Sequence, residues 1–157
     1  MQSLKKCAAI ILAVSSAFLL AADPIPKLNV IPEKTVLSPA LLKNPVTFTG
    51  SGYQPKEMVV VDLIVPQGVT MKGLEEGEDR VGVAFGNADE NGNFKAAVGP
   101  SALLNWFFQV GWTPLLSPDF KEAKPLPPGK YEFEATGMDS EKISKTTLEL
   151  LPPPQKK

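Results

Sequence analysis

The sequence predicts an all-β protein in which two sheets pack face to face as a sandwich, interrupted by a short helical or irregular apolar insertion. Short segments of alternating apolar and polar residues recur between turn-forming dipeptides, as in half-buried strands. All 16 prolines follow residue 22 and are spread through the chain, which disfavours a bundle of helices. The chain beyond that point is long enough to build one domain around a single core.

Six segments carry the strand pattern, and their apolar positions predict the core. In residues 58–65, Val59, Val61 and Leu63 alternate with Asp62 and are expected to point inward. The dipeptide Asn91-Gly92 predicts a tight turn before the strand that opens at residue 94. The predicted strands are residues 46–50, 58–65, 81–86, 94–98, 131–135 and 144–150. The aromatic residues expected in the core are Phe48, Phe85, Phe94, Tyr131 and Phe133.

Several of the turns share a pattern with a known family. The elements are Gly50-Ser51-Gly52-Tyr53, the turn proline Pro55, the hairpin Asp89 to Phe94, and Pro128-Gly129-Lys130-Tyr131 before a strand ending at Gly137. The chain thereby resembles the bacterial immunoglobulin-like domains of secreted and surface proteins. A weaker similarity is to the neocarzinostatin-like sandwiches, which hold a small molecule in a cleft but carry disulfides.

This resemblance implies a domain organisation and a kind of role. It implies an immunoglobulin-like sandwich over residues 45–151, with insertions at 66–80 and 100–124 that the family pattern does not require. Residues 23–44 are expected to form an extended lead-in with an edge strand near 27–30, and residues 152–157 an exposed Pro/Lys tail. Domains of this kind usually space, adhere or assemble, and the resemblance brings no catalytic residues with it.

The first 22 residues have the layout of a secretory signal peptide. Lys5 and Lys6 precede an apolar run from Cys7 to Leu20, and Ala21-Ala22 supplies small residues for cleavage. The run is shorter than the roughly 20 residues of a spanning helix, so a membrane tether is expected only if the signal stays uncleaved. Because Cys7 opens the run and does not close it, a lipoprotein is excluded. The chain is therefore expected to be periplasmic, at the cell surface or secreted.

The composition excludes several kinds of function. The chain has no histidine, and its one cysteine, Cys7, leaves with the signal. A Ser-His-Asp or Cys-His nucleophile, a thiolate or imidazole zinc site, and haem held by His or Cys are all excluded. The net charge of −1 becomes more acidic once Lys5 and Lys6 are removed, which disfavours nucleic acid as a partner. We therefore expect a non-enzymatic protein without a cofactor.

The insertion at 100–124 is the candidate binding segment. Ser101 is a capping residue and no helix breaker follows up to Val110, so a helix is predicted over 102–110, with Asn105 and Gln109 as its polar stripe. One interpretation is that the insertion closes one end of the sandwich; another is an exposed patch for a partner protein. Contact with a membrane surface is a third, although the charges nearby are mixed. The candidate partner-binding residues are Trp106, Phe107, Phe108 and Trp112.

Acidic residues offer a second, weaker candidate. A loop within 66–80 carries four carboxylates, and the turn at residue 89 adds a fifth; together they are weak calcium candidates. The EF-hand pattern fails, because its twelfth position from Asp89 is Pro100. A glycosidase-like pair of carboxylates would need a defined separation across a cleft. The residues concerned are Glu75, Glu76, Glu78, Asp79 and Asp89.

These observations predict an exported, non-enzymatic binding or structural module. Its partner would be an envelope or extracellular protein, or a second copy of the chain, contacted through the aromatic insertion. The alternative is a sandwich that binds a small molecule or a glycan, with Trp106 and Trp112 as stacking platforms.

Overall fold

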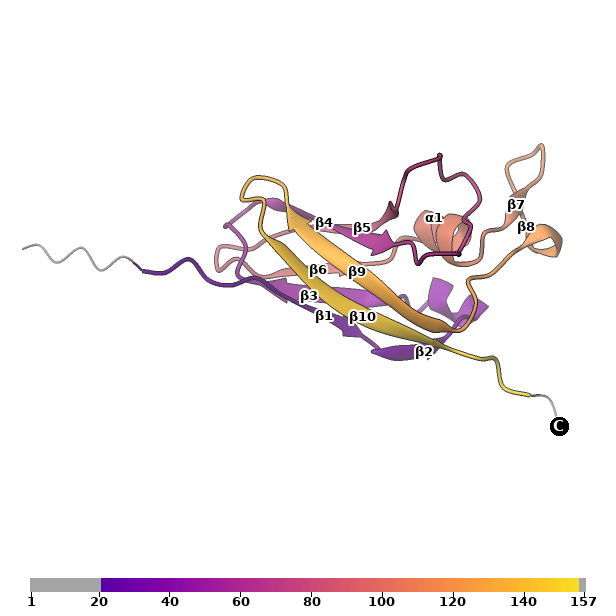
Figure 1. Cartoon of the computed structure of the whole chain (residues 1–157), viewed down its shortest axis with the longest axis horizontal. Helices are drawn as coiled ribbons and strands as arrows, with labels where there is room; N and C mark the ends of the chain where they lie inside the picture. The colour runs from indigo at the N-terminus through magenta and orange to yellow at the C-terminus, as the bar shows by residue number, and fades with distance from the viewer. Residues whose placement is uncertain (1–20, 156–157) are drawn as a thin grey trace, which may run out of the picture.

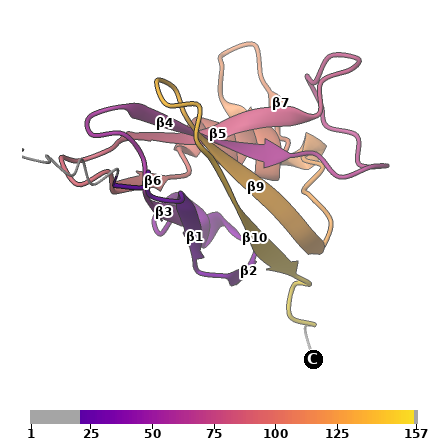
Figure 2. The same ribbon diagram turned by 60° about the vertical axis from the view of Figure 1, so that its left-hand side comes forward.

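The computed structural model describes residues 21–155 and confirms the predicted all-β sandwich with a short helical insertion. Its two larger sheets form separate layers (Figures 1 and 2). The first sheet has the order β1-β3-β6. Its strands are β1 (Lys27–Ile31), β3 (Thr47–Ser51) and β6 (Phe94–Ala97). The second has the order β2-β10-β9-β4-β5, with strands β2 (Lys34–Val36), β10 (Ile143–Leu151), β9 (Gly129–Gly137), β4 (Met58–Ile64) and β5 (Arg80–Asn87).

The N-terminal strands contribute to both sheets. β1 lies at an edge and pairs antiparallel with β3, where Val30 is opposite Phe48. Only two residues later the chain enters β2, which pairs parallel with β10, Thr35 being opposite Leu150. The peptide bond between Ile31 and Pro32, at the crossing, is cis. The remaining neighbours in both sheets are antiparallel.

The core lies between the two sheets and follows the alternation of the strands. Val59, Val61 and Leu63 of β4 are fully buried, as predicted. At the centre, the ring centroids of Phe48 and Phe133 lie 5.0 Å apart. Phe133 is also stacked on a ring from the insertion. Side chains from both sheets and from the insertion therefore share one hydrophobic cluster.

Phe85 is not part of the core, which corrects the expectation from the sequence. The pairing of β4 with β5 shifts by one residue between Val61 and Asp62, because Val61 is opposite Ala84 whereas Asp62 is opposite Gly82. Such a bulge reverses the alternation of the strand beyond it. Ala84 is consequently buried next to Val83, and Phe85 points outward with 74% of its surface exposed.

Three of the four turn motifs predicted from the sequence, at residues 50–53, 55 and 89–94, lie together at one end of the sandwich. The fourth, Pro128 to Tyr131, lies at the other end, where β9 begins. The Tyr53 ring packs edge-on against Phe94, with centroids 5.3 Å apart, and its hydroxyl donates to the Ala135 carbonyl at 3.3 Å. A Cβ atom added to Gly50 would overlap the Phe94 ring, and one on Gly92, whose φ is +76°, would lie 2.3 Å from the Tyr53 carbonyl oxygen. These positions require glycine for packing, so the motif specifies the fold.

The two insertions meet at the other end. Residues 66–79 form a loop, and residues 100–124 form a helical segment, a small hairpin and a short helical turn (Figure 1). The elements of the second insertion are α1 (Pro100–Ala102), η2 (Leu103–Phe107), β7 (Gly111–Trp112), β8 (Pro118–Asp119) and η3 (Phe120–Glu122).

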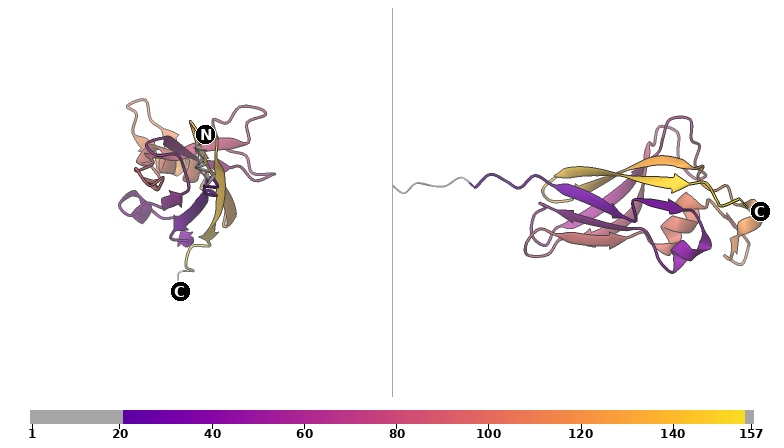
Figure 3. Two further views of the ribbon diagram at one scale, coloured as in Figure 1. Left: turned by 90° about the vertical axis from the view of Figure 1, so that its left-hand side faces the viewer. Right: turned by 90° about the horizontal axis from the view of Figure 1, so that it is seen from below.

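The described N-terminal residues leave from the opposite end of the molecule (Figure 3). Residues 1–20 of the predicted signal peptide lie outside the described part of the chain, as do the last two residues of the predicted tail. No helix within residues 21–155 is long and apolar enough to cross a membrane.

Candidate binding site: an apolar groove beside the insertion

An open groove runs between the outer face of the β4–β5 pair and the helical insertion. Its volume is about 790 Å³, and its walls are mostly apolar. The two strands supply one wall and α1 with η2 supplies the other. The principal lining residues are Met58, Val60, Phe85, Pro100, Ala102 and Trp106.

The helical segment positions Trp106 because two turns of different width follow one another. Pro100 takes the first helical position, where its missing N–H costs nothing, and the Leu103 amide donates to the Gly99 carbonyl at 2.9 Å. The next turn widens to a π-helix, in which the Phe108 amide donates to the Leu103 carbonyl at 2.9 Å. The helix thus spans residues 100–107, beginning and ending earlier than the predicted 102–110.

Two of the four candidate partner-binding aromatics are core residues. Phe107 is fully buried, and its ring stacks on Phe133 with centroids 6.3 Å apart. Phe108 is also buried and packs edge-on against Phe120. The expectation that Phe107 and Phe108 would contact a partner is therefore wrong, because the helix presents this side to the core. That side of the insertion closes one end of the sandwich.

Trp106 and Trp112 lie outside the core in different surroundings. Trp106 is half-buried and lines the groove. Trp112, on β7, is 47% exposed, and its indole Nε1 donates to Asn105 Oδ1 at 3.0 Å. Trp112 is absent from the groove lining, so the two tryptophans do not form one stacking platform there.

Gln109 connects the two insertions through hydrogen bonds and does not form the predicted polar stripe with Asn105. With φ at +47° it ends the helix, and its side chain turns inward and is buried. The side-chain Nε2 donates to the Lys124 carbonyl at 2.8 Å, and Oε1 accepts from the Lys72 amide at 2.8 Å. Both of its partners are backbone groups that would otherwise lack these bonds.

Replacing Gln109 by leucine is expected to lower the free energy of unfolding by about 2 kcal/mol, because two backbone groups lose their partners. Hydrogen exchange of the Lys72 amide should accelerate by more than the loss of global unfolding free energy explains. Gln67→Leu, in the exposed part of the same loop, is the matched control and should change neither quantity. An unchanged Lys72 exchange rate in Gln109→Leu would contradict the role assigned to this side chain.

The apolar surface continues from the groove across the second sheet. The register places Val60 opposite Phe85 on one side and opposite Thr136 on the other. Thr136 is in turn opposite Ile143 on β10, which is exposed. Four neighbouring strands therefore present one row of apolar or β-branched side chains to the outside.

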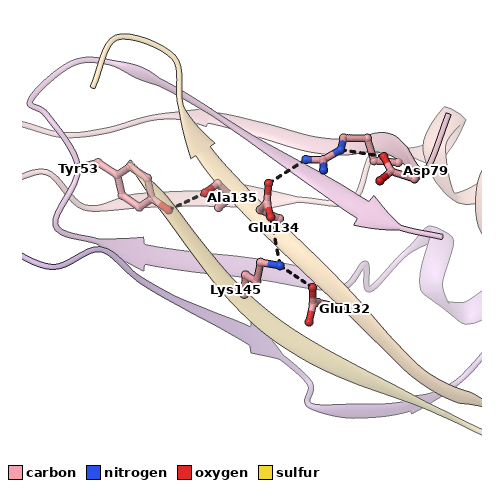
Figure 4. A network of polar contacts seen from close by, with 7 residues as sticks. Tyr53, Asp79, Glu132, Glu134, Ala135 and Lys145 are labelled. Atoms are coloured by element: carbon pink, nitrogen blue, oxygen red, sulfur yellow. Dashed lines mark hydrogen bonds and ion pairs between the residues drawn. The ribbon is translucent and has the colours of Figure 1, made fainter. Parts of the chain in front are cut away.

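Charged side chains lie beside this apolar row, since Glu134 and Lys145 are opposite each other two residues away from Thr136 and Ile143. Figure 4 shows these charged side chains and their contacts. Arg80 Nη1 donates to Glu134 Oε1 at 2.8 Å, and Lys145 Nζ lies 3.4 Å from Glu134 Oε2 and 2.8 Å from Glu132 Oε1. The hydrogen bond to Glu132, with a further one to Glu134, raises the pKa of Lys145. Burial raises the pKa of Asp62 on the neighbouring strand, against the attraction of Arg80. Arg80, Glu134 and Lys145 are thus paired within the sheet and form a polar border to the apolar row.

The acidic candidates are not gathered into a metal site. Within residues 21–155 no group of three or more His, Cys, Asp or Glu side chains is arranged to hold an ion. Asp79 pairs with Arg80 at 3.2 Å. Asp89 Oδ1 accepts from the Asn91 and Asn93 amides at 2.8 and 2.9 Å, and the Asn93 bond in particular lowers its pKa. Glu78 Oε2 accepts from the Glu75 amide at 3.1 Å, while Glu76 is exposed in the same loop.

The sequence pattern missed several exposed apolar residues. Phe85 could not be recognised, because only the bulge turns it outward. Leu115 and Leu116, at the tip of the β7–β8 hairpin, stand between Pro114 and Ser117-Pro118, a turn signal that could have identified them.

No family model matches the chain, and no curated protein matches it. Among solved structures, one similar chain is described as "Crystal structure of BslA - A bacterial hydrophobin". The two are 12% identical, the match covers 85% of this chain and 97% of that one, and the TM-score is 0.35. A similarity at this level carries no conclusion about function.

Proposed function

We propose that the chain is an exported, non-enzymatic binding or structural module that holds an apolar segment of a partner protein in the groove. The groove of about 790 Å³, with Phe85 and Trp106 on its walls, is the observation that carries the proposal. Export is supported by the signal-peptide pattern of the first 22 residues. A non-enzymatic role is supported by the lack of histidine and by the position of the one cysteine within that signal.

The extent of the apolar surface favours a protein as the partner. The row from Phe85 through Val60 and Thr136 to Ile143 extends beyond the groove and crosses four strands. The paired charges of Arg80, Glu134 and Lys145 border it. An apolar centre with a polar rim is the usual anatomy of a protein interface.

A small apolar ligand is the second candidate, and the size of the groove favours it. Sites for small molecules usually enclose about 300–1,000 Å³ and have mostly apolar walls. A glycan stacked between both tryptophans has less support, because Trp112 does not line the groove.

Phe85→Ser is the sharpest test of the groove, because this side chain is exposed and its loss should change the free energy of unfolding by no more than about 0.5 kcal/mol. Partner binding should weaken about tenfold or more, as for a central aromatic contact. Binding is measured by titration against the partner, found by photo-crosslinking from position 85. Met138→Ser is the matched control, since Met138 is also exposed but belongs to the β9–β10 turn.

The two candidates and a second copy of the chain give different results. A protein partner gives crosslinks from position 85 and none from position 138. A second copy gives a concentration-dependent mass in sedimentation that Phe85→Ser abolishes. A small ligand changes the fluorescence of Trp106 while the protein stays monomeric. Equal binding by Phe85→Ser and the unmodified protein would exclude the groove as the site.

A further inference from the structure

The β7–β8 hairpin presents two leucines at its tip. Leu115 is 88% exposed and Leu116 is 81% exposed. Trp112 and Phe120, about half-exposed, flank the base of the hairpin. The hairpin stands out from the body of the sandwich (Figures 1 and 3). Neither leucine lines the groove, so this surface is separate from the proposed binding site.

Three of the four backbone N–H groups of the tip, residues 113–117, are paired within it. The Thr113 amide donates to the Ser117 carbonyl at 2.9 Å, and the Leu116 amide donates to the Thr113 carbonyl at 2.9 Å. The Ser117 amide donates to Thr113 Oγ1 at 3.2 Å, and Pro114 has no N–H. In an apolar medium each unpaired backbone group costs several kcal/mol, so these three internal bonds lower the cost of placing the tip in hydrocarbon.

The tip is also free of charge, and its conformation is held with some strain. No charged residue occurs from Ala96 to Pro118, although 21% of the chain is charged. Leu116 has a φ of +57°, a conformation that glycine and asparagine adopt more readily than leucine. An exposed turn with leucine at this position retains an apolar side chain where a polar one would fit better.

We propose that the β7–β8 hairpin inserts Leu115 and Leu116 into the hydrocarbon layer of a phospholipid bilayer. Trp112 and Phe120 then lie at the level of the headgroups, where aromatic side chains are enriched. The Trp112 N–H keeps its bond to Asn105, so its ring is oriented before contact.

A bilayer fits this surface better than a protein pocket does. The tip is convex and without charge, so it offers no complementary charge that would fix a protein partner in one orientation. A bilayer accepts an apolar protrusion in any rotation about its axis. Charged residues near the base, Asp119, Lys121, Glu122 and Lys124, are of both signs, which suits zwitterionic headgroups and does not require anionic lipid.

The test is co-sedimentation of the purified protein with vesicles of phosphatidylcholine. The unmodified protein should bind reversibly, and the double variant Leu115→Ser with Leu116→Asn should bind about a hundredfold more weakly, or about tenfold for each leucine. Asparagine tolerates the backbone of position 116, so the variant should keep its fold. Met138→Ser is the control: it also removes an exposed apolar side chain, from the β9–β10 turn, and its binding to vesicles should be unchanged.

Fluorescence places the hairpin in the membrane. The chain has two tryptophans, so Trp106→Phe leaves Trp112 as the reporter. Its emission should shift to the blue on vesicle addition and be quenched by brominated acyl chains. No binding of the unmodified protein, or equal binding of the double variant, would overturn the proposal. So would binding that needs anionic lipid and disappears in salt, or a soluble protein that captures the tip while vesicles do not.

Discussion

Replacing Phe107 by alanine is expected to lower the free energy of unfolding by about 3–5 kcal/mol, because a large aromatic side chain is removed from a fully packed place in the core. The ring is 1% exposed and stacks on Phe133, which itself packs against Phe48 at the centre of the core. Its removal leaves a cavity between the insertion and both sheets. The measurement is equilibrium unfolding in urea, with the change in midpoint taken at a constant slope.

Trp112→Ala is the matched control for this prediction. It removes a larger aromatic side chain from the same insertion, but one that is about half-exposed and outside the core cluster. It should lower the free energy of unfolding by about 1 kcal/mol, the usual contribution of one hydrogen bond and partial packing. Similar losses of unfolding free energy in Phe107→Ala and Trp112→Ala would contradict the prediction, because they would mean that the burial of Phe107 does not hold the insertion on the core.

Replacing Glu57 by glutamine is expected to lower the free energy of unfolding by about 3 kcal/mol. Glu57 is 1% exposed, and its carboxylate accepts from the Asp139 amide at 3.1 Å and from the Ser140 amide and hydroxyl at 2.9 and 2.8 Å. It also accepts from the Gln54 amide. One carboxylate thereby joins the turn before β4 to the turn between β9 and β10. Glutamine has only one acceptor oxygen, and its amide group would face donors.

The same carboxylate should make the stability dependent on pH. Burial would raise the pKa of Glu57, but the hydrogen bonds from Ser140, Gln54 and Asp139 outweigh it and lower the pKa below the ordinary 4.5. A carboxylate whose pKa is lowered on folding stabilises the folded state fully at pH values above its pKa in the unfolded chain. This stabilisation is lost as the pH falls through the pKa that the group has in the folded protein. The unmodified protein should lose stability below about pH 4.5, and Glu57→Gln should lose less over that range.

Thermal unfolding between about pH 3 and pH 7 measures both effects. Glu76→Gln is the control, because Glu76 is exposed in the loop within residues 66–79. It should match the unmodified protein at each pH. Parallel pH profiles for the unmodified protein and Glu57→Gln would show that the carboxylate charge does not stabilise these turns.

The strands were predictable because their determinants are local. Alternation of side chains with a period of two placed Val59, Val61 and Leu63 inward, and the structure buries all three. The turn at Asn91-Gly92 forms with φ of +76° at the glycine, as a tight turn requires. The short edge strand β2 and the small β7–β8 pair went unpredicted, because two or three residues carry no recognisable period.

The candidate site was less predictable because its residues depend on contacts far apart in the sequence. A helix over the insertion could be predicted from the residues of 100–110, but which side faces the core could not. All the aromatic residues of the insertion are apolar enough either to be buried in the core or to lie at a binding surface. The structure assigns Phe107 and Phe108 to the core, Trp106 to the groove and Trp112 to the hairpin.

The sequence by itself determined the β-sandwich, most of its strands and turns, and the lack of imidazole and of any thiol beyond Cys7. Only the tertiary structure decided which apolar side chains are exposed. A one-residue bulge in the pairing of β5 with β4 turns Phe85 outward. The hydrogen bonds of Gln109 dock one insertion on the other. The packing of the helix beside β4 and β5 leaves a groove between them. The hydrophobicity of a side chain determines that it prefers burial. The register between strands determines which face of the sheet it lies on.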